Sequence, residues 1–324
     1  MSRLTTAEVQ ERLRHGLTPA VPVPFTAAGQ VSTAAQQQYV AWMAQQPVAG
    51  VAVWAHTGRG LRLTRAQRVE ILQSWAEGLG GEKVLVAGVG GSPERAEDFS
   101  AYIISALEMA QDALDHGAQA LLVHPPRLFH HVANNRDLLL TYHRELASTG
   151  APQFLFYLYE AAGGFPYSAD HLRELFALPG VAGIKLATLD SVMTFQSVAN
   201  PLAREFPEKL IITGEDRFLG YSLMCGAQAA LIGMGAACTT LQHKLLTTYF
   251  EGRAAEFLEI SPKVDRLSQA TFIPPMEGYI RRMLWALVHQ GVISREAAHD
   301  PWGPALPENE FVELGNTLRA LGEI

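Results

Sequence analysis

Residues 181–190 read VAGIKLATLD, a short apolar run with a lysine inside it. The small and β-branched residues around Lys185 are typical of a strand that is buried on both faces. A lysine on such a strand either extends its stem to water or is desolvated, with a lowered pKa. Because a neutral amine can attack a carbonyl carbon, Lys185 is a candidate for Schiff-base chemistry. The alternative is a lysine that only reaches solvent from the end of a strand.

Seven further apolar segments share this character, and helical patterns separate them. The eight expected strands lie near residues 18, 51, 85, 121, 154, 183, 211 and 230. Apolar strands that lack alternation and are joined by helices predict a parallel sheet. Eight such units predict a closed (β/α)8 barrel. A doubly wound sheet is the alternative, but no GxGxxG motif follows the first strand.

Helical patterns complete the predicted α/β architecture. One helix is expected before the first strand, at residues 6–15, and the helices expected between the strands cover residues 32–46, 64–78, 93–117, 135–149, 169–177, 191–199 and 218–226. After residue 241 the strand pattern ends, and three more helices are expected, at 243–259, 274–290 and 308–321. We therefore predict a TIM barrel over residues 1–240, followed by a C-terminal helical extension over residues 241–324.

Composition limits the classes of function. The 324 residues are 48% hydrophobic and 18% charged, which predicts a globular chain with a large core. A net charge of −7 argues against nucleic acid or an anionic membrane as the partner. No apolar run is long enough for a spanning helix, and the first residues lack the apolar core of a signal peptide. The only cysteines, Cys225 and Cys238, lack CxxC spacing, so we expect a reducing cytoplasm.

Polar side chains follow several of the predicted strands. In a (β/α)8 barrel, reactive groups gather at the C-terminal ends of the strands. The predicted ends carry Thr26, His56, Thr57, His124, Arg127, Tyr157, Tyr159, Lys185, residues 214–216 and Gly233. A tyrosine on the fifth strand would neighbour the lysine on the sixth, where a phenol can carry protons. The Thr57 hydroxyl and the backbone amides of Thr57 and Gly58 could hold a carboxylate.

These residues resemble those of the dihydrodipicolinate synthase / N-acetylneuraminate lyase family, over roughly residues 15 to 300. The family consists of class I aldolases with a (β/α)8 barrel and a C-terminal helical region. GIKLATLD is similar to the family's Gly-Ile-Lys-Glu-Ala-Thr-Gly-Asp, which implies that Lys185 forms the imine. PQFLFYLYEAAGG is similar to the family's strand ending in Tyr-Asn-x-Pro. The family places its catalytic tyrosine 28 residues before the lysine, which implies Tyr157, with Tyr159 as the near rival.

Three further motifs imply substrate-binding residues. AHTGRGLRLT is similar to the family's Gly-Thr-Thr-Gly-Glu-x-x-x-Leu, so Thr57 and Gly58 are expected to bind the keto-acid carboxylate. TGEDRFL resembles its Ser-Gly-Asp-Asp loop, which implies that Gly214 and Glu215 lie near the substrate tail. LIGMGA resembles its Val-Ile-Ser-Val strand, which implies that Ile232 lies close to the lysine.

Four positions depart from the family pattern. His56 replaces the relay threonine; it could take over acid–base work, or it could be a rim histidine bonded to a carbonyl. Arg59 replaces the loop glutamate, and Arg127, an expected substrate-binding residue, replaces a tyrosine that reaches into a neighbouring subunit. Ala162 replaces the arginine that serves the semialdehyde carboxylate in synthase members, which favours a sugar-acid type of substrate.

The resemblance implies a Schiff-base lyase that acts on pyruvate or a 2-keto-3-deoxy sugar acid by aldol addition or cleavage. Two alternative reactions would pass through the same imine: dehydration of such an acid and the synthesis of 4-hydroxy-tetrahydrodipicolinate. No cofactor is expected. The resemblance also implies a homodimer or a homotetramer. Two other classes remain. One is a metal-dependent barrel that uses His56, His124, His130 and His131. The other is a barrel that keeps the lysine but only binds or regulates.

Overall fold

The computed structural model describes residues 4–95, 98–126, 129, 132, 135–189 and 191–324. Its centre is a sheet of eight parallel strands in the order β1-β8-β7-β6-β5-β4-β3-β2. The strands are β1 (Leu17–Pro19), β2 (Gly50–Val53), β3 (Val84–Val89), β4 (Ala120–Val123), β5 (Gln153–Leu158), β6 (Val181–Ala187), β7 (Leu210–Thr213) and β8 (Ala229–Ile232). All eight strands lie where the apolar runs predicted them.

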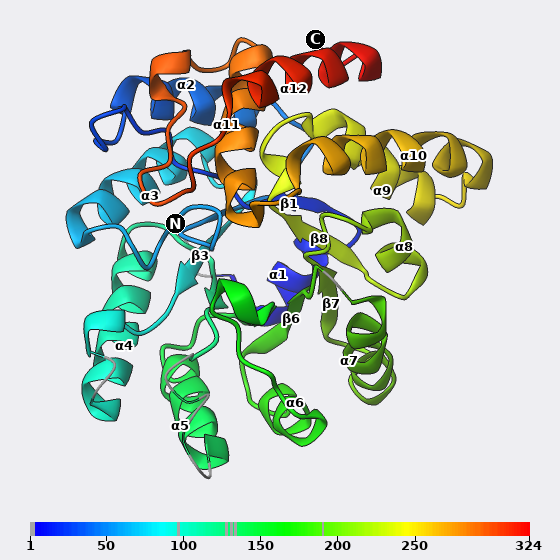
Figure 1. The fold of residues 1–324 in the computed structure, drawn as a ribbon. Helices are drawn as coiled ribbons and strands as arrows, with labels where there is room; N and C mark the ends of the chain where they lie inside the picture. Colours follow the sequence, from blue (N-terminus) through cyan, green and yellow to red (C-terminus); the bar gives the residue numbers. More distant parts are fainter. Residues whose placement is uncertain (1–3, 96–97, 127–128, 130–131, 133–134, 190) are drawn as a thin grey trace.

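The two edge strands of this sheet meet and close it into a barrel. Beyond the end of β1, Ala20 forms a parallel bridge with Ala52 of β2, and the Val21 N–H donates to the Ala52 carbonyl at 3.0 Å. Helices alternate with the strands and surround them (Figure 1). The prediction of a (β/α)8 barrel followed by C-terminal helices is confirmed.

The helices around the barrel follow the predicted segments closely. They are α1 (Thr6–Leu13), α2 (Thr33–Ala44), α3 (Arg65–Leu79), α4 (Phe99–Asp115), α5 (Asn135–Ala147), α6 (Ala169–Phe176), α7 (Val192–Glu205) and α8 (Leu219–Met224). Thr5, Thr64 and Ser168 begin α1, α3 and α6 with capping boxes, in which each side chain accepts from the third helical N–H. The long segment predicted at 93–117 is a short 3-10 turn, η1 (Pro93–Arg95), and then α4, which Asp98 caps.

The C-terminal region departs from the prediction at one point. The helix expected at 243–259 is two helices, α9 (Thr239–Phe250) and α10 (Ala254–Thr271). Gly252 ends the first of them with a φ of +71°, a conformation that glycine adopts without steric cost. The chain continues through η5 (Met276–Gly278), α11 (Tyr279–His289), η6 (Arg295–Ala297) and α12 (Glu308–Leu321). Helices α10, α11 and α12 pack on one another, and one end of α11 lies over the middle of the barrel in Figure 1.

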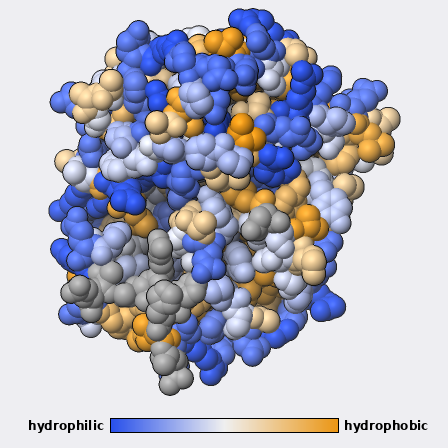
Figure 2. Space-filling model, viewed as in Figure 1, coloured by the Kyte–Doolittle hydropathy of each residue, from blue (hydrophilic) through white to orange (hydrophobic). Residues whose placement is uncertain are grey.

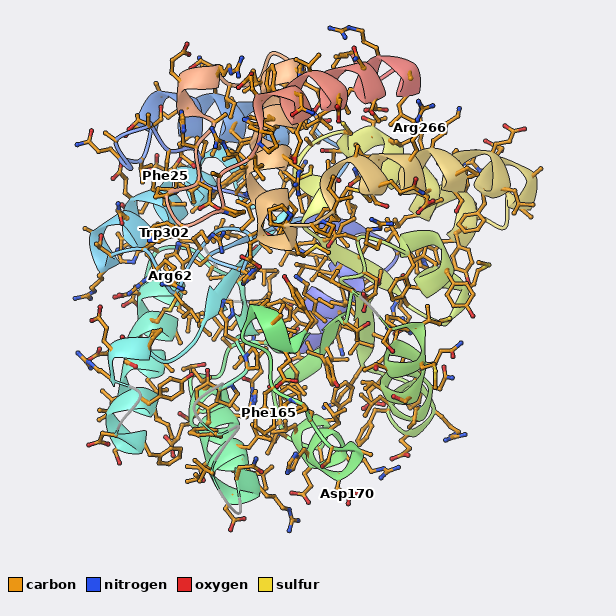
Figure 3. All side chains as sticks on the ribbon, in the orientation of Figure 1. Phe25, Arg62, Phe165, Asp170, Arg266 and Trp302 are labelled. Carbon is orange, nitrogen blue, oxygen red and sulfur yellow. The ribbon has the colours of Figure 1, made fainter. Side chains whose placement is uncertain are left out.

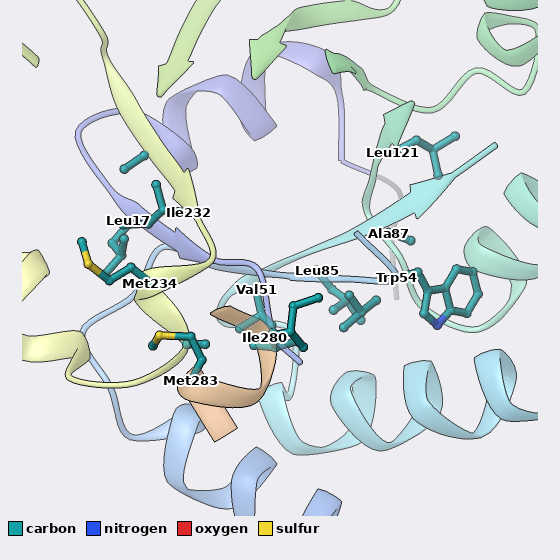
Figure 4. Close-up of a cluster of buried hydrophobic side chains, with 14 of the residues drawn as sticks. Leu17, Val51, Trp54, Leu85, Ala87, Leu121, Ile232, Met234, Ile280 and Met283 are labelled. Carbon is teal, nitrogen blue, oxygen red and sulfur yellow. The ribbon is translucent and has the colours of Figure 1, made fainter. Parts of the chain in front are cut away.

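Buried apolar side chains form two clusters, and strand residues alternate between them. The inner cluster fills the barrel and includes Val86, Leu122, Phe154, Phe156, Ile212 and Leu231. The outer cluster lies between strands and helices and includes Leu17, Leu155, Ile184, Leu186 and Met283; Figure 4 shows part of it. Ile184 and Leu186 both join the outer cluster, so Lys185 between them faces the inside of the barrel.

One end of the barrel is closed by the N-terminal helix. Val9 and Leu13 of α1 belong to the inner cluster, and the Gln10 amide donates to the carbonyls of Ala182 and Glu208 at 2.8 and 2.9 Å. These carbonyls lie at the N-terminal ends of β6 and β7, so α1 covers that end. A site inside the barrel must therefore open at the C-terminal ends of the strands.

Hydrophilic side chains cover most of the face drawn in Figure 2, and only small apolar patches interrupt them. Among the helices that the structure describes, none combines the length and the apolar character that a membrane span requires.

Candidate active site

Lys185 lies on β6 inside the barrel, in register with Phe156 of β5 and Ile212 of β7. Only 5% of the residue is exposed, and its Nζ lies 4.4 Å from the centre of the Phe156 ring. The stem passes close to Gly214, where an added Cβ would come within 2.7 Å of the lysine Cε. The loop after β7 therefore needs a glycine at this position, because any side chain would displace the lysine.

The charge state of Lys185 is set by burial and by two carboxylates. Burial lowers the pKa of the amine, and the negative charges of Asp216 and Glu215 raise it again, so that it lies at about 8. A lysine with this pKa carries an appreciable neutral fraction near neutral pH. The neutral form is the nucleophile in imine formation.

The two carboxylates face different parts of the site. Asp216 lines the cavity around the lysine, its Oδ1 accepts from the Met234 N–H at 2.6 Å, and burial raises its pKa to about 7. Glu215 instead accepts from the backbone N–H groups of Thr188 and Leu189, both at 2.7 Å. The carboxylate of Glu215, which was predicted to lie near the substrate tail, thus holds the loop after β6. The residue after it, Asp216, reaches the cavity.

A narrow cavity of about 20 Å³ surrounds the lysine amine, enough for a water-sized group. Besides Lys185 it is lined by His56, Thr57, Phe156, Leu158, Tyr159, Ala187, Leu189, Gly214, Asp216, Gly233, Phe272 and Tyr279. A second cavity of about 660 Å³ shares His56 and Leu158 with it. Arg62 and Trp302, labelled in Figure 3, both line this larger space.

Of the two candidate tyrosines, Tyr159 lines the lysine cavity and Tyr157 does not. Tyr157 pairs with Leu186, packs on the outer cluster and lies 5.9 Å from the Tyr167 ring. Spacing along the chain pointed to Tyr157, but alternation along β5 turns Phe156 inward and Tyr157 outward. Tyr159 follows the end of β5 and lines the lysine cavity.

The loop after β2 brings Thr57 into the cavity. Thr57 is buried, and its Oγ1 lies 2.9 Å from the Tyr279 hydroxyl, with either group able to donate. Gly58 lies against the backbone instead, because an added Cβ would approach the Val21 carbonyl oxygen to 2.9 Å. Trp54 and Arg59, at either end of the turn, have φ values of +56° and +54°, which are uncommon for residues with side chains.

Glu277 of η5 connects the groups at the mouth of the cavity. Its Oε1 accepts from the Tyr159 hydroxyl at 3.0 Å and lies 2.9 Å from His56 Nε2. Its Oε2 accepts from Arg59 Nη1 at 2.7 Å, and Arg59 Nη2 also donates to Asp300 Oδ2 at 2.7 Å. Burial acts to raise the pKa of Glu277, but hydrogen bonds and charge from His56 and Arg59 hold it down at about 2. In the absence of substrate the group is therefore a carboxylate, which accepts hydrogen bonds from its neighbours.

Of the remaining predicted residues, Ile232 does not line the lysine cavity. Ile232 is fully buried in the outer cluster, and the next residue, Gly233, lines the cavity. Arg127, like His130 and His131, lies outside the described residues. Within the described ranges, no three His, Cys, Asp or Glu side chains form a group that could hold a metal ion. His124 Nε2 lies 3.2 Å from the Trp54 carbonyl oxygen, and burial lowers the pKa of His124 to about 4.

The sequence reasoning missed Glu277, Tyr279, Phe272 and Asp300. All four follow α9, far from the strand motifs, and no local pattern marks them as part of a site. Two other cavity residues could have been found from the sequence. The alternation of side chains along β5 indicates Phe156, and its place just after the end of β7 indicates Asp216.

Residues 14–321 match the family model described as the dihydrodipicolinate synthetase family. N-acetylneuraminate lyase 2 of Escherichia coli O6:H1 is 20% identical over 294 residues, which cover 91% of this chain and 90% of that protein. A 4-hydroxy-tetrahydrodipicolinate synthase of Stenotrophomonas maltophilia is 28% identical over 222 residues, covering 68% and 69%. A prophage protein of the dihydrodipicolinic acid synthase family from E. coli K12, solved in complex with pyruvate, superposes with a TM-score of 0.81 at 20% identity, covering 95% and 99%.

Proposed function

The chain belongs to the dihydrodipicolinate synthetase family, and from that premise we propose that it is a Schiff-base lyase in which Lys185 forms an imine with a 2-oxo acid such as pyruvate. Lyases of the class I aldolase type are among its relatives, which supports an enzyme of this class. The observation that carries the proposal is a single amine, 5% exposed inside the barrel, with a pKa of about 8. Nucleophilic amine catalysis needs this combination of desolvation and lowered pKa.

The proposed reaction begins when neutral Lys185 attacks C2 of the 2-oxo acid. Asp216, with its pKa of about 7 in the same cavity, protonates the carbinolamine hydroxyl, which leaves as water. The protonated imine then accepts the electron pair of the C3–H or the C3–C4 bond, and an enamine forms. Tyr159 carries the proton that these steps release or require. The Thr57–Tyr279 hydroxyl pair has one hydrogen left to donate to the substrate carboxylate.

The larger cavity beside the lysine is the proposed place for the rest of the substrate. Ala162 lines this cavity, and the resemblance places it where synthase members carry the arginine for a semialdehyde carboxylate. This favours aldol cleavage or addition of a 2-keto-3-deoxy sugar acid, or of pyruvate with an aldehyde. Dehydration of such an acid and 4-hydroxy-tetrahydrodipicolinate synthesis pass through the same imine, and a panel of these substrates separates them by their products.

The cellular and quaternary setting belongs to the same proposal. We expect a cytoplasmic homodimer or homotetramer, with a barrel over residues 1–240 and a helical extension over 241–324. Light scattering on the purified protein measures the number of subunits.

Borohydride reduction in the presence of pyruvate tests the imine. Peptide mass spectrometry is expected to find one reduced pyruvyl adduct on Lys185. The variant Lys185→Met is expected to remain unmodified and to lose activity by at least roughly 1000-fold, because it removes the proposed nucleophile. A folded wild-type protein that gains no mass would remove this proposal and leave only the family and the barrel.

A further inference from the structure

We propose that Glu277 is a positioning residue that takes the proton of Tyr159 and exchanges it with the larger cavity, in a proton relay built from one subunit and oriented by a hydrogen bond from His56. The inference rests on the proposed function, because it assigns the path by which protons reach and leave the lysine imine. The relay combines the loop after β2, the end of β5 and the segment between α10 and α11, which meet only in the folded chain.

The hydrogen bonds fix the direction of each donor. A carboxylate can only accept, so the Tyr159 hydroxyl donates to Glu277 Oε1 over 3.0 Å. For the same reason His56 donates from Nε2, at 2.9 Å from Oε1 and 3.1 Å from Oε2. One carboxylate oxygen therefore receives both a phenol and an imidazole N–H. Charge-assisted bonds of this kind are stronger and better oriented than neutral ones.

This orientation decides what Tyr159 can do. Its hydrogen points to Glu277, so the lone pairs of its oxygen remain for the cavity that it shares with Lys185. A substrate proton can move to the tyrosine oxygen while the original phenol proton moves to Glu277 Oε1. Tyr159 then acts as a base without becoming a free phenolate, which burial and the nearby negative charge of Glu277 disfavour.

The proposed step balances without any further reactant. In aldol cleavage, the C3–C4 electron pair moves into the enamine and neutralises the iminium nitrogen. The C4 hydroxyl becomes the aldehyde carbonyl, and its proton goes to the Tyr159 oxygen. The phenol proton goes to Glu277, and addition follows the same path in reverse. In pyruvate alone, a C3 proton takes the place of the C4 hydroxyl proton.

The relay has an exit to water and a rigid frame. The side chain of His56 is 18% exposed and that of Glu277 is 35% exposed, and both line the larger cavity. Arg59 holds the other oxygen of Glu277 at 2.7 Å and is itself held by Asp300, whose side chain is buried. The carboxylate therefore keeps its place while protons pass through it.

Glu277→Gln tests the relay, with Glu313→Gln on the exposed face of α12 as the matched control. The probe is pyruvate, read in two ways: the reduced adduct on Lys185 and the rate at which its methyl group takes up deuterium from D2O. We expect adduct formation within about 3-fold of wild type for both variants. Methyl exchange is expected to fall roughly 100-fold in Glu277→Gln, the scale of one proton-transfer group, and to stay unchanged in Glu313→Gln.

Two further variants separate a relay from a merely structural role. If Tyr159 and Glu277 act as one unit, the double variant Tyr159→Phe/Glu277→Gln exchanges no more slowly than Tyr159→Phe alone, within about 3-fold. Added formate is expected to restore exchange at least roughly 10-fold in Glu277→Ala, because it can replace the missing carboxylate.

The possible failures are distinguishable. The relay is overturned if Glu277→Gln exchanges deuterium at the wild-type rate. It is also overturned if the loss of exchange in the double variant equals the product of the two single losses. In both cases the adduct on Lys185 still supports the proposed lyase. Equal loss of adduct and exchange without formate rescue also overturns the relay, since Glu277 then serves structure alone. A wild-type protein without any adduct overturns the proposed function and this inference together.

Discussion

The reactivity of Lys185 depends on a balance between burial and charge. Its pKa of about 8 leaves about one amine in ten neutral at pH 7, against roughly one in three thousand for an unshifted lysine. Burial alone would lower the pKa further, and the carboxylates of Asp216 and Glu215 oppose it. The neutral fraction of Lys185 rises with pH, while the protonated fraction of the proposed donor Asp216, with its pKa of about 7, falls. The rate of imine formation is thus expected to pass through a maximum between about pH 7 and pH 8 and to fall above it.

Asp216→Asn tests this balance. Without the Asp216 charge, the protonated amine loses a stabilising partner, so the pKa of Lys185 falls and the pH midpoint of the rising limb of imine formation moves down by roughly one unit. The maximal rate is also expected to fall, and the decline above pH 8 to disappear, because the proposed proton donor is lost. The measurement is the initial rate of the borohydride-trapped pyruvate adduct between pH 6 and pH 10. An unchanged or higher midpoint would contradict the assignment; Asp265→Asn on the exposed face of α10 is the control.

The two tyrosines near the end of β5 give a second residue-level prediction. Tyr159→Phe removes the hydroxyl that lines the lysine cavity and is expected to slow deuterium exchange into pyruvate roughly 100-fold or more. Tyr157→Phe removes a hydroxyl on the outer face and is expected to leave exchange within about 3-fold. NMR of pyruvate in D2O measures both. The opposite ranking would restore the tyrosine that spacing alone selects.

Sequence reasoning located the site to within one or two residues but not always to the correct side chain. It selected Tyr157, Glu215 and Ile232, whereas the structure brings Tyr159, Asp216 and Gly233 to the cavity. The apolar pattern identifies a strand and its end. Which side chain faces inward depends on where alternation stops, and that is decided by contacts with neighbouring strands.

Among the elements, the strands were predictable because each one is an apolar run bounded by turn residues. The helices after the barrel were less predictable, because the turn at Gly252 interrupts a segment whose sequence reads as one continuous helix. The segment between α10 and α11 owes its place to Arg282, which is buried and donates to the carbonyl of Ile273 at 2.8 Å. Arg282 also donates from Nε to Glu310 at 2.8 Å, so α11, α12 and this segment are held together.

Arg282→Ala is expected to lower the free energy of unfolding by about 3 kcal/mol, because it leaves Glu310 and several carbonyls without their donor. The same change loosens the segment that carries Glu277. Urea unfolding measures the first effect, and deuterium exchange into pyruvate measures the second. Arg266→Ala, exposed on α10 and labelled in Figure 3, is expected to cost less than about 0.5 kcal/mol. Equal stability of the two variants would show that Arg282 does not hold the segment.

At the scale of the whole molecule, the chain closes one end of the barrel and builds the site at the other. Helix α1 covers the N-terminal ends of the strands, while Glu277, Tyr279 and Asp300 from the C-terminal region reach the loop after β2. No sequence pattern predicts these contacts, because the partners lie more than two hundred residues apart and meet only through the packing of the last helices. Lys185 could be recognised from the sequence of its own strand, whereas Glu277, at the mouth of the lysine cavity, could not.

This architecture divides the proposed work between two spaces, a cavity of about 20 Å³ around the amine and one of about 660 Å³ beside it. If the imine forms in the smaller cavity and the larger cavity holds the acceptor aldehyde, filling the larger cavity should weaken only the binding and reaction of the aldehyde. Ala162→Trp adds bulk to the larger cavity, which Ala162 lines, while Ala162 is not among the residues that line the smaller cavity. Deuterium exchange into pyruvate alone is then expected within about 3-fold of wild type. For aldol addition, kcat/KM with a hexose-sized aldehyde is expected to fall at least roughly 10-fold more than with glycolaldehyde, since only the larger acceptor needs the filled space. Equal losses for both aldehydes, or loss of exchange, would mean that the two spaces do not act separately.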